Sequence, residues 1–317
     1  MDRSAQINQL TSALGISLVE QVEVALNAND IAILQDFLCW KRTRFLSQGY
    51  TEQDVADLFD TIRATFSDGM DHAAGEKVTQ FIDDAICSLD CKNQSPDSTD
   101  DPLSELSANY RALLLGGDRK QASTLILDSA ASGVPVRDIY LHVFQNSLYE
   151  IGRLWQTNQI TIAQEHFFTA ATQMIMSQLY PYIFANQKNG LRMIAASVDS
   201  NMHDIGIRMV ADFFEMDGWD TYYLGGNAPS QAILQALDET SPHLLALSAT
   251  ISKQIPIIEQ VIQGVRERDQ ANRVKVIVGG PPFNISDNLW KKVGSDGFAT
   301  SADEAVSLAN RLFGLGG

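Results

Sequence analysis

The chain has 317 residues and a formal net charge of −16, with 45% hydrophobic and 20% charged residues. This length allows two or three domains with buried cores, and the composition is typical of a globular protein. The acidic balance argues against direct nucleic-acid binding, because neutralising phosphates requires a basic surface. No stretch reaches the roughly 20 apolar residues of a spanning helix, and the N-terminus lacks a signal-peptide pattern, so we expect a cytoplasmic protein without membrane contact.

The first 91 residues are predicted to form an N-terminal helical domain. Apolar residues recur at three-and-four spacing within 16–26 and again within 31–38, and Thr51 is a candidate N-cap for a further helix. The three cysteines, Cys39, Cys87 and Cys91, are expected to be free thiols. Residues 92–102 are polar and contain two prolines, which predicts a linker.

Residues 103–186 are predicted to form a four-helix bundle. The expected helices cover 103–115, 118–132, 136–156 and 159–184, separated by breaks at Gly116-Gly117, Gly133-Val134-Pro135 and Thr157-Asn158. Short connections of this kind place neighbouring helices antiparallel.

Residues 190–317 change to a pattern of short apolar segments that alternate with helical ones. Strands are expected at 191–198, 221–224, 243–250 and 274–278, with a fifth near Phe298. Strands that alternate with helices predict a parallel sheet covered on both faces, here a five-stranded α/β domain of the flavodoxin-like, Rossmann-like class.

Binding residues of such a sheet gather where the strands end, at their carboxyl edge. The first of these loops carries His203, where a dinucleotide site would carry glycines. An imidazole in this position can bind a metal through one nitrogen while an acceptor holds the other. The later loops provide Ser248, Thr250 and a Gly279-Gly280 pair.

These residues resemble the cobalamin-binding domain shared by corrinoid methyltransferase proteins, mutases and cobalamin-dependent photoreceptors. The resemblance rests on Asn201-Met202-His203-Asp204-Ile205-Gly206, on Ser248-Ala249-Thr250 and on Gly279-Gly280, and it covers about residues 103–314. It implies that His203 is the lower axial ligand of cobalt, that Gly206 admits the nucleotide tail and that Ser248 contacts the buried dimethylbenzimidazole. The cofactor contacts implied in this domain are Asn201, Asp204, Ile205, Gly206, Ser248, Thr250, Gly279 and Gly280.

Asn201 departs from the family pattern, which has an acidic residue there to hold the second nitrogen of the histidine. An amide oxygen can accept the same hydrogen bond, but it leaves the imidazole less electron-rich than a carboxylate would. We therefore expect a weaker bond between cobalt and His203.

The bundle carries a second resemblance. Trp155, nine residues and then Glu165-His166 resemble the Trp-x9-Glu-His motif of CarH-like adenosylcobalamin photoreceptors. In that family the tryptophan covers the upper face of the cofactor and the Glu-His pair faces the adenosyl group. The family has a histidine directly after the tryptophan as the upper ligand after illumination, but this chain has Gln156, a poor cobalt ligand. His142, His166 or water remains for that role.

The combined resemblance predicts a light sensor that is not an enzyme. Photolysis of adenosylcobalamin would change the helical cap, and with it self-association or the surface offered to a protein partner. Methylcobalamin remains open as the native form, and so does a second chromophore such as biliverdin within residues 1–91, as in photocobilins. Two alternatives are a corrinoid shuttle protein of a methyltransferase system and a cobalamin sensor that does not respond to light.

Overall fold

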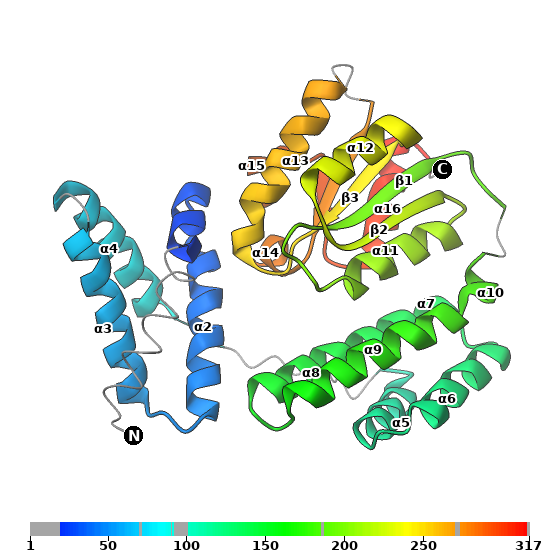
Figure 1. The fold of residues 1–317 in the computed structure, drawn as a ribbon, viewed down its shortest axis with the longest axis horizontal. Coiled ribbons are helices and arrows are strands. Elements are labelled where there is room, and N and C mark those ends of the chain that lie inside the picture. The colour runs from blue at the N-terminus through cyan, green and yellow to red at the C-terminus, as the bar shows by residue number, and fades with distance from the viewer. Residues whose placement is uncertain are drawn as a thin grey trace.

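The computed structural model describes residues 20–69, 72–89, 91, 101–184, 187–269 and 273–315. Most of the predicted linker and the start of the first apolar pattern lie outside these residues. Figure 1 shows a helical N-terminal part, a helical cap and an α/β part that contains the sheet. Within the described chain, no helix is both long and apolar enough to cross a membrane.

The N-terminal part consists of helical residues 20–28 and of α2 (Ile31–Ser47), α3 (Glu52–Gly69) and α4 (His72–Cys87). Asp30 caps α2, because its side chain accepts a hydrogen bond from the Ala32 amide at 3.1 Å. The helices bury apolar side chains such as Ile33, Leu34 and Ile82 between them.

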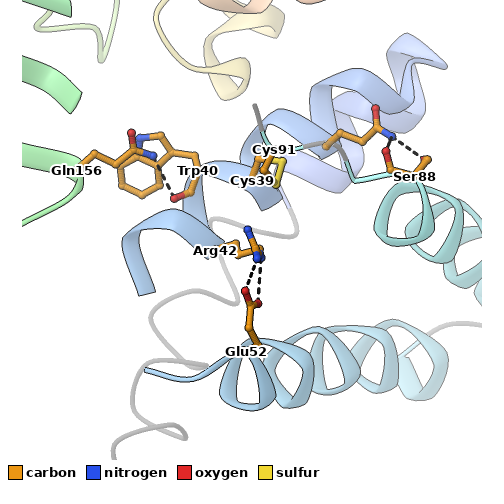
Figure 2. Close-up of a disulfide and its surroundings, with 8 residues drawn as sticks. Cys39, Trp40, Arg42, Glu52, Ser88, Cys91 and Gln156 are labelled. Atoms are coloured by element: carbon orange, nitrogen blue, oxygen red, sulfur yellow. Dashed lines mark hydrogen bonds and ion pairs between the residues drawn. A yellow bond between two sulfur atoms is a disulfide. The ribbon is translucent and has the colours of Figure 1, made fainter. Parts of the chain in front are cut away.

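The expectation of three free thiols is wrong. Cys39 on α2 and Cys91, just beyond α4, form a disulfide with a Cα–Cα distance of 5.3 Å, and only Cys87 is free (Figure 2). Figure 2 places this bridge beside Trp40. The packing of α4 against α2 brings two cysteines together that are 52 positions apart in the sequence.

The cap follows the predicted bundle closely. It contains α5 (Ser104–Leu115), α6 (Arg119–Ala131), the short α7 (Val136–Asp138) that continues through a π-helical stretch (Ile139–Gln145) into α8 (Asn146–Gln156), then α9 (Ile162–Gln178) and α10 (Tyr180–Ile183). The last predicted helix is divided, since α9 ends at Gln178 and Pro181 stands in the first turn of α10. Thr161 and Gln164 form a capping box that fixes the start of α9.

The α/β part is the predicted five-stranded parallel sheet, in the order β2-β1-β3-β4-β5. Its elements are β1 (Arg192–Val198), α11 (Ile205–Met216), β2 (Asp220–Ala228), α12 (Ser230–Thr240), β3 (Leu244–Ser248), a 3-10 turn (Ser252–Gln254), α13 (Ile255–Arg268), β4 (Lys275–Gly279), α14 (Pro281–Asn284), α15 (Leu289–Lys292), β5 (Gly297–Ala299) and α16 (Ala302–Phe313). The prediction ended β2 at Leu224, but the strand continues to Ala228. A register shift skips Leu224 between the pairs Ala195–Tyr223 and Ala196–Gly225, and the pairing with β1 resumes beyond it.

The two faces of the sheet belong to different cores. Met193, Ala195 and Leu244 point to the core that includes α11, α16 and the cap, whereas Ile194 and Leu245 point to the core of α12 and α13. Figure 1 shows α11 between the sheet and the cap. The cap thus packs on the side of the sheet that α11 and α16 cover. The end of the cap where α8 is followed by α9 (residues 156–162), here called its free end, lies against α2.

The disulfide should stabilise the N-terminal part by restricting its unfolded chain. We expect Cys39→Ser/Cys91→Ser to lower the free energy of unfolding by about 2–4 kcal/mol in urea titrations followed by circular dichroism. Cys87→Ser is the control and should leave stability unchanged. Equal stability of the double variant and the wild type would contradict the bridge, as would three reactive thiols in the folded wild type.

Candidate functional site

His203 lies at the carboxyl edge of the sheet, in the loop between β1 and α11, and its side chain is exposed. The loop backbone is held on both sides, because the His203 amide donates to Asn201 Oδ1 at 3.2 Å and its carbonyl accepts from Ser197 Oγ at 3.3 Å. Met202 beside it is 75% exposed, and Ile251 in the loop after β3 is 40% exposed. An accessible imidazole and apolar side chains at one edge suit a large planar ligand that needs a single protein ligand to its metal.

Asn201 is fully buried, and its side chain serves the backbone. Its Nδ2 donates to the Ser248 carbonyl at 3.2 Å, and its Oδ1 accepts from the His203 amide. A carboxylate could accept the second bond but could not donate the first. The amide therefore suits this position, and the predicted contact between Asn201 and the His203 ring stays a prediction.

The glycines at this edge of the sheet are there for different structural reasons. A Cβ on Gly280 would lie 1.9 Å from the Ala249 carbonyl oxygen, and one on Gly279 would lie 3.2 Å from that of Ala299, so backbone packing requires or favours glycine at both positions. At Gly206, in the first turn of α11, no atom lies within 4 Å of the Cβ position. Gly206 leaves room for a ligand beside His203, which fits the predicted passage of a nucleotide tail.

Ser248 and Thr250 flank the end of β3, and both are half-buried. The loop there is fixed by Gln254, which is 1% exposed: its Oε1 accepts from the Thr250 amide at 2.7 Å and its Nε2 donates to the Ser200 carbonyl at 3.0 Å. Sequence reasoning missed Gln254, since a glutamine four residues beyond a loop threonine carries no recognisable pattern.

Asp204 links the histidine loop to the cap. Its Oδ1 accepts from Gln173 Nε2 of α9 at 2.7 Å, and its Oδ2 accepts from the Tyr223 hydroxyl of β2 at 3.0 Å. Burial, and secondarily the Asp204 charge, raise the pKa of Tyr223 and keep this hydroxyl a donor. Ile205, the next residue, is buried at the start of α11. Asp204, predicted to touch the cofactor, thus holds cap and sheet together.

A second polar contact joins cap and sheet farther along α11. Arg208 donates to the Gln173 carbonyl at 3.1 Å and to Ser177 Oγ at 2.8 Å, while Tyr140 donates to Asp212 Oδ2 at 2.9 Å. Burial raises the pKa of Asp212 to about 6, although the Tyr140 hydrogen bond and the Arg208 charge act in the opposite direction.

The cap residues of the predicted motif lie at its free end. Trp155 stands in the last turn of α8, where its ring is 6.1 Å from that of Trp40, centroid to centroid, and 4.9 Å from the Arg44 guanidinium carbon. Glu165 accepts from Thr169 Oγ1 at 3.1 Å and contacts His166, whose side chain is 73% exposed. His142 instead contacts Asp101, with Nδ1 2.9 Å from the carboxylate. The contact of Trp155 with the N-terminal part was not predicted.

Comparison with known proteins identifies the class of the chain. Residues 191–307 match a family described as B12 binding domain, and residues 106–180 match a second B12 binding domain family. The chain is therefore a protein with a cobalamin-binding domain and the helical domain that accompanies it.

The similar proteins are corrinoid proteins. Dimethylamine corrinoid protein 1 of Methanosarcina acetivorans is 25% identical over 200 residues, which cover 61% of this chain and 91% of that protein. A corrinoid protein of Desulfitobacterium hafniense is 24% identical over 67% of this chain and 99% of its own length. The solved monomethylamine corrinoid protein of Methanosarcina barkeri has the same fold, with a TM-score of 0.59 at 23% identity over 66% of this chain and 99% of that one.

These relatives overturn the predicted light sensor. All are named as corrinoid proteins, those of Methanosarcina as dimethylamine or monomethylamine corrinoid proteins, and they support the shuttle alternative. The expectation that the chain is not itself an enzyme is confirmed. The motif spacing was misleading because the same residues have structural roles in this chain. Trp155 packs against Trp40 of α2, and Glu165 accepts a hydrogen bond from Thr169 within α9.

Asn201→Asp tests the structural role of the buried amide. At pH 7.5 we expect a loss of about 1–3 kcal/mol in the free energy of unfolding, because the Ser248 carbonyl loses its donor and meets a buried carboxylate. Asn227→Asp is the control, since Asn227 only accepts, from the Ser200 amide at 2.7 Å. Urea unfolding of both variants measures the difference, and equal losses would disprove the assignment.

Asp212 should make stability depend on pH. Its pKa is about 6 when folded against 3.8 for an ordinary carboxyl, so the folded state binds the proton more tightly. The protonated Asp212 side chain therefore contributes to the free energy of unfolding below pH 4. This contribution, about 3 kcal/mol, is lost as the pH rises toward 6. Asp212→Asn should remove this slope in urea titrations from pH 4 to 7, whereas the exposed Asp287→Asn should retain it.

Proposed function

We propose that the protein is a corrinoid-carrying methyl carrier that serves partner methyltransferases. The observation that carries the proposal is the alignment of nearly the whole length of corrinoid proteins with about two thirds of this chain. The exposed His203 at the carboxyl edge of the sheet supports it, as does the open position at Gly206. Methylated amines, named in the relatives, are the proposed source of the methyl group.

The residues divide the work as follows. Bound cobalamin supplies the reactive cobalt that accepts and releases a methyl group. His203 would ligate the cobalt, and Asn201 fixes the loop backbone that presents it. Asp204 and Gln173 hold the cap beside this loop, while Gly206, Ser248 and Thr250 would receive the nucleotide tail. Trp155, Glu165 and His166, at the end of α8 and the start of α9, would contact the bound cofactor from the cap.

The proposed methyl-carrier function requires a different cofactor form and a different partner from those predicted for a light sensor. A methyl carrier uses methylcobalamin, so methylcobalamin replaces adenosylcobalamin as the proposed form. Biliverdin and light-dependent association belonged to the light sensor and are withdrawn with it. A methyltransferase is the proposed protein partner, whereas homo-oligomerisation and a cytoplasmic location stay predictions from the sequence.

His203→Ala tests cobalt ligation. After loading with hydroxocobalamin, the variant should show an absorption spectrum different from the wild type, and its affinity should fall at least about tenfold because a metal bond is lost. His243→Gln is the control, because His243 lies at the opposite edge of the sheet, directly before β3. Identical spectra of His203→Ala and wild type would exclude the ligand role.

The carrier role needs a separate measurement on the wild type. Protein loaded with carbon-13 methylcobalamin should pass the label to a thiol when a corrinoid-dependent thiol methyltransferase is added. Transfer from free methylcobalamin but none from the loaded protein would count against a carrier.

A further inference from the structure

The N-terminal part has no counterpart in the matched portion of the chain. The two B12 binding domains span residues 106–307, and the relatives are covered over 91% and 99% of their own length. A carrier of their kind is therefore complete without residues 20–91. The contacts of this N-terminal part with the rest of the chain indicate what it could do.

Helix α2 joins the sheet edge to the free end of the cap. At its beginning, Asp30 accepts a hydrogen bond from Ser286, which follows the Gly279-Gly280 loop and α14. Near its end, Arg44 and Ser47 reach the last turn of α8. The 14 residues from Asp30 to Arg44 span about 21 Å of helix. Figure 1 shows α2 beside the α8 end of the cap and the α14 side of the sheet.

Arg44 makes the central contact. Its Nη1 donates to the Trp155 carbonyl at 2.7 Å and to the Gln156 carbonyl at 3.2 Å, and its guanidinium lies over the Trp155 ring at 4.9 Å. Ser47 Oγ donates to the Gln156 carbonyl at 3.0 Å. The carbonyls in the last turn of α8 thus accept hydrogen bonds from the Arg44 cation and from Ser47 of another part of the chain, and the Trp155 carbonyl also accepts from the Asn158 amide at 3.0 Å.

Trp40 and Gln156 complete this contact. Gln156 Nε2 donates to the Trp40 carbonyl at 3.4 Å, and Figure 2 shows the two side chains beside each other. Trp40 remains 37% exposed although its ring lies next to Trp155. An exposed tryptophan at this place offers a flat apolar surface to a ligand held beside Trp155.

The free end of the cap extends beyond the histidine loop. Glu165, Thr169 and Gln173 are spaced four residues apart on α9, and Gln173 contacts Asp204 next to His203. Glu165 therefore lies about 12 Å farther along the helix than this contact. Trp155 and its contacts with α2 are at that same end of the cap.

We propose that α2 is a third wall of the corrinoid site and that Arg44 is the positioning residue that holds it against Trp155, so that α2 restricts access to the upper face. This inference rests on the proposed corrinoid site but not on methyl transfer. When α2 is in place, small ligands and a partner enzyme reach the upper face slowly. When the Arg44 contact is broken, they reach it faster, while the lower side with His203 is unaffected.

The test measures cyanide binding to the protein loaded with hydroxocobalamin, by stopped-flow absorbance. Arg44→Ala should accelerate ligand binding roughly tenfold, because a charged hydrogen bond and a cation–π contact are lost together. Its affinity for hydroxocobalamin should change less than about threefold, since the lower contacts remain. Arg44→Lys keeps the charge and a donor and should lie between the wild type and Arg44→Ala.

Arg42→Ala is the matched control. Arg42 is on the same helix but pairs with Glu52 of α3 within the N-terminal part, as Figure 2 shows. It should leave the cyanide rate unchanged. Equal rates for Arg44→Ala and wild type, or equal acceleration by Arg42→Ala, would overturn the proposal and leave the carrier function intact.

A measurement without cofactor separates the two proposals. Small-angle X-ray scattering of the apo protein should give a larger radius of gyration for Arg44→Ala than for wild type and Arg42→Ala. Failure of every variant to bind cobalamin would refute the proposed function and, with it, the wall of a corrinoid site. An unchanged radius of gyration would refute the positioning role of Arg44 by itself.

Discussion

The hydrogen bonds of the Asp204 carboxylate are the interaction on which the site depends. One oxygen holds Gln173 of the cap and the other holds Tyr223 of the sheet, while the residue itself adjoins His203. The cap and the sheet are separate structural units joined by a short segment of the chain, so contacts such as this one set their relative position. Because these hydrogen bonds join the histidine loop to the cap, they fix the position of His203 relative to the cap helices that would contact a cofactor bound between them.

A buried amide supports the same loop from within. The Asn201 oxygen accepts from the His203 amide of the loop, and its NH2 group donates to the Ser248 carbonyl at the end of β3, so the one side chain ties the loop to the neighbouring strand. A family pattern with an acid at this position assigns the residue to the imidazole. The local geometry assigns it to the backbone, which explains how the chain can depart from the pattern and still present His203 at the same edge.

Much of the fold could be predicted from the sequence, because the spacing of apolar residues and the positions of glycines and prolines reflect local structure. The apolar segments gave four of the strands within a few residues, glycines and prolines marked the cap helices, and the loop position of His203 followed from the strand before it. The disulfide could not be predicted, since Cys39 and Cys91 meet only after α4 packs on α2. The partners of Trp155 could not be predicted either, because Arg44 lies 111 positions away and binds carbonyls, which leave no mark in a sequence.

The light-sensor interpretation failed for a related physical reason. A spacing motif records where side chains lie along a chain, but it does not record what covers them. In this chain the neighbours of Trp155 are Trp40 and Arg44 of α2. Here Gln156 turns its amide to the Trp40 carbonyl and the last carbonyls of α8 are taken by Arg44 and Ser47, so this end is built to hold a protein segment.

The chemistry of the Arg44 contact limits how α2 can be displaced. Arg44 donates to two backbone carbonyls and lies over an aromatic ring, so the contact joins a fixed cation to fixed acceptors of the cap. Displacement therefore requires a competitor that binds the open arrangement better than the closed one. A methyltransferase that offers a carboxylate to Arg44 and an apolar surface to Trp155 would meet this condition. A small molecule that only binds the cobalt would not, and this difference would let the carrier exclude solvent ligands while admitting its partner.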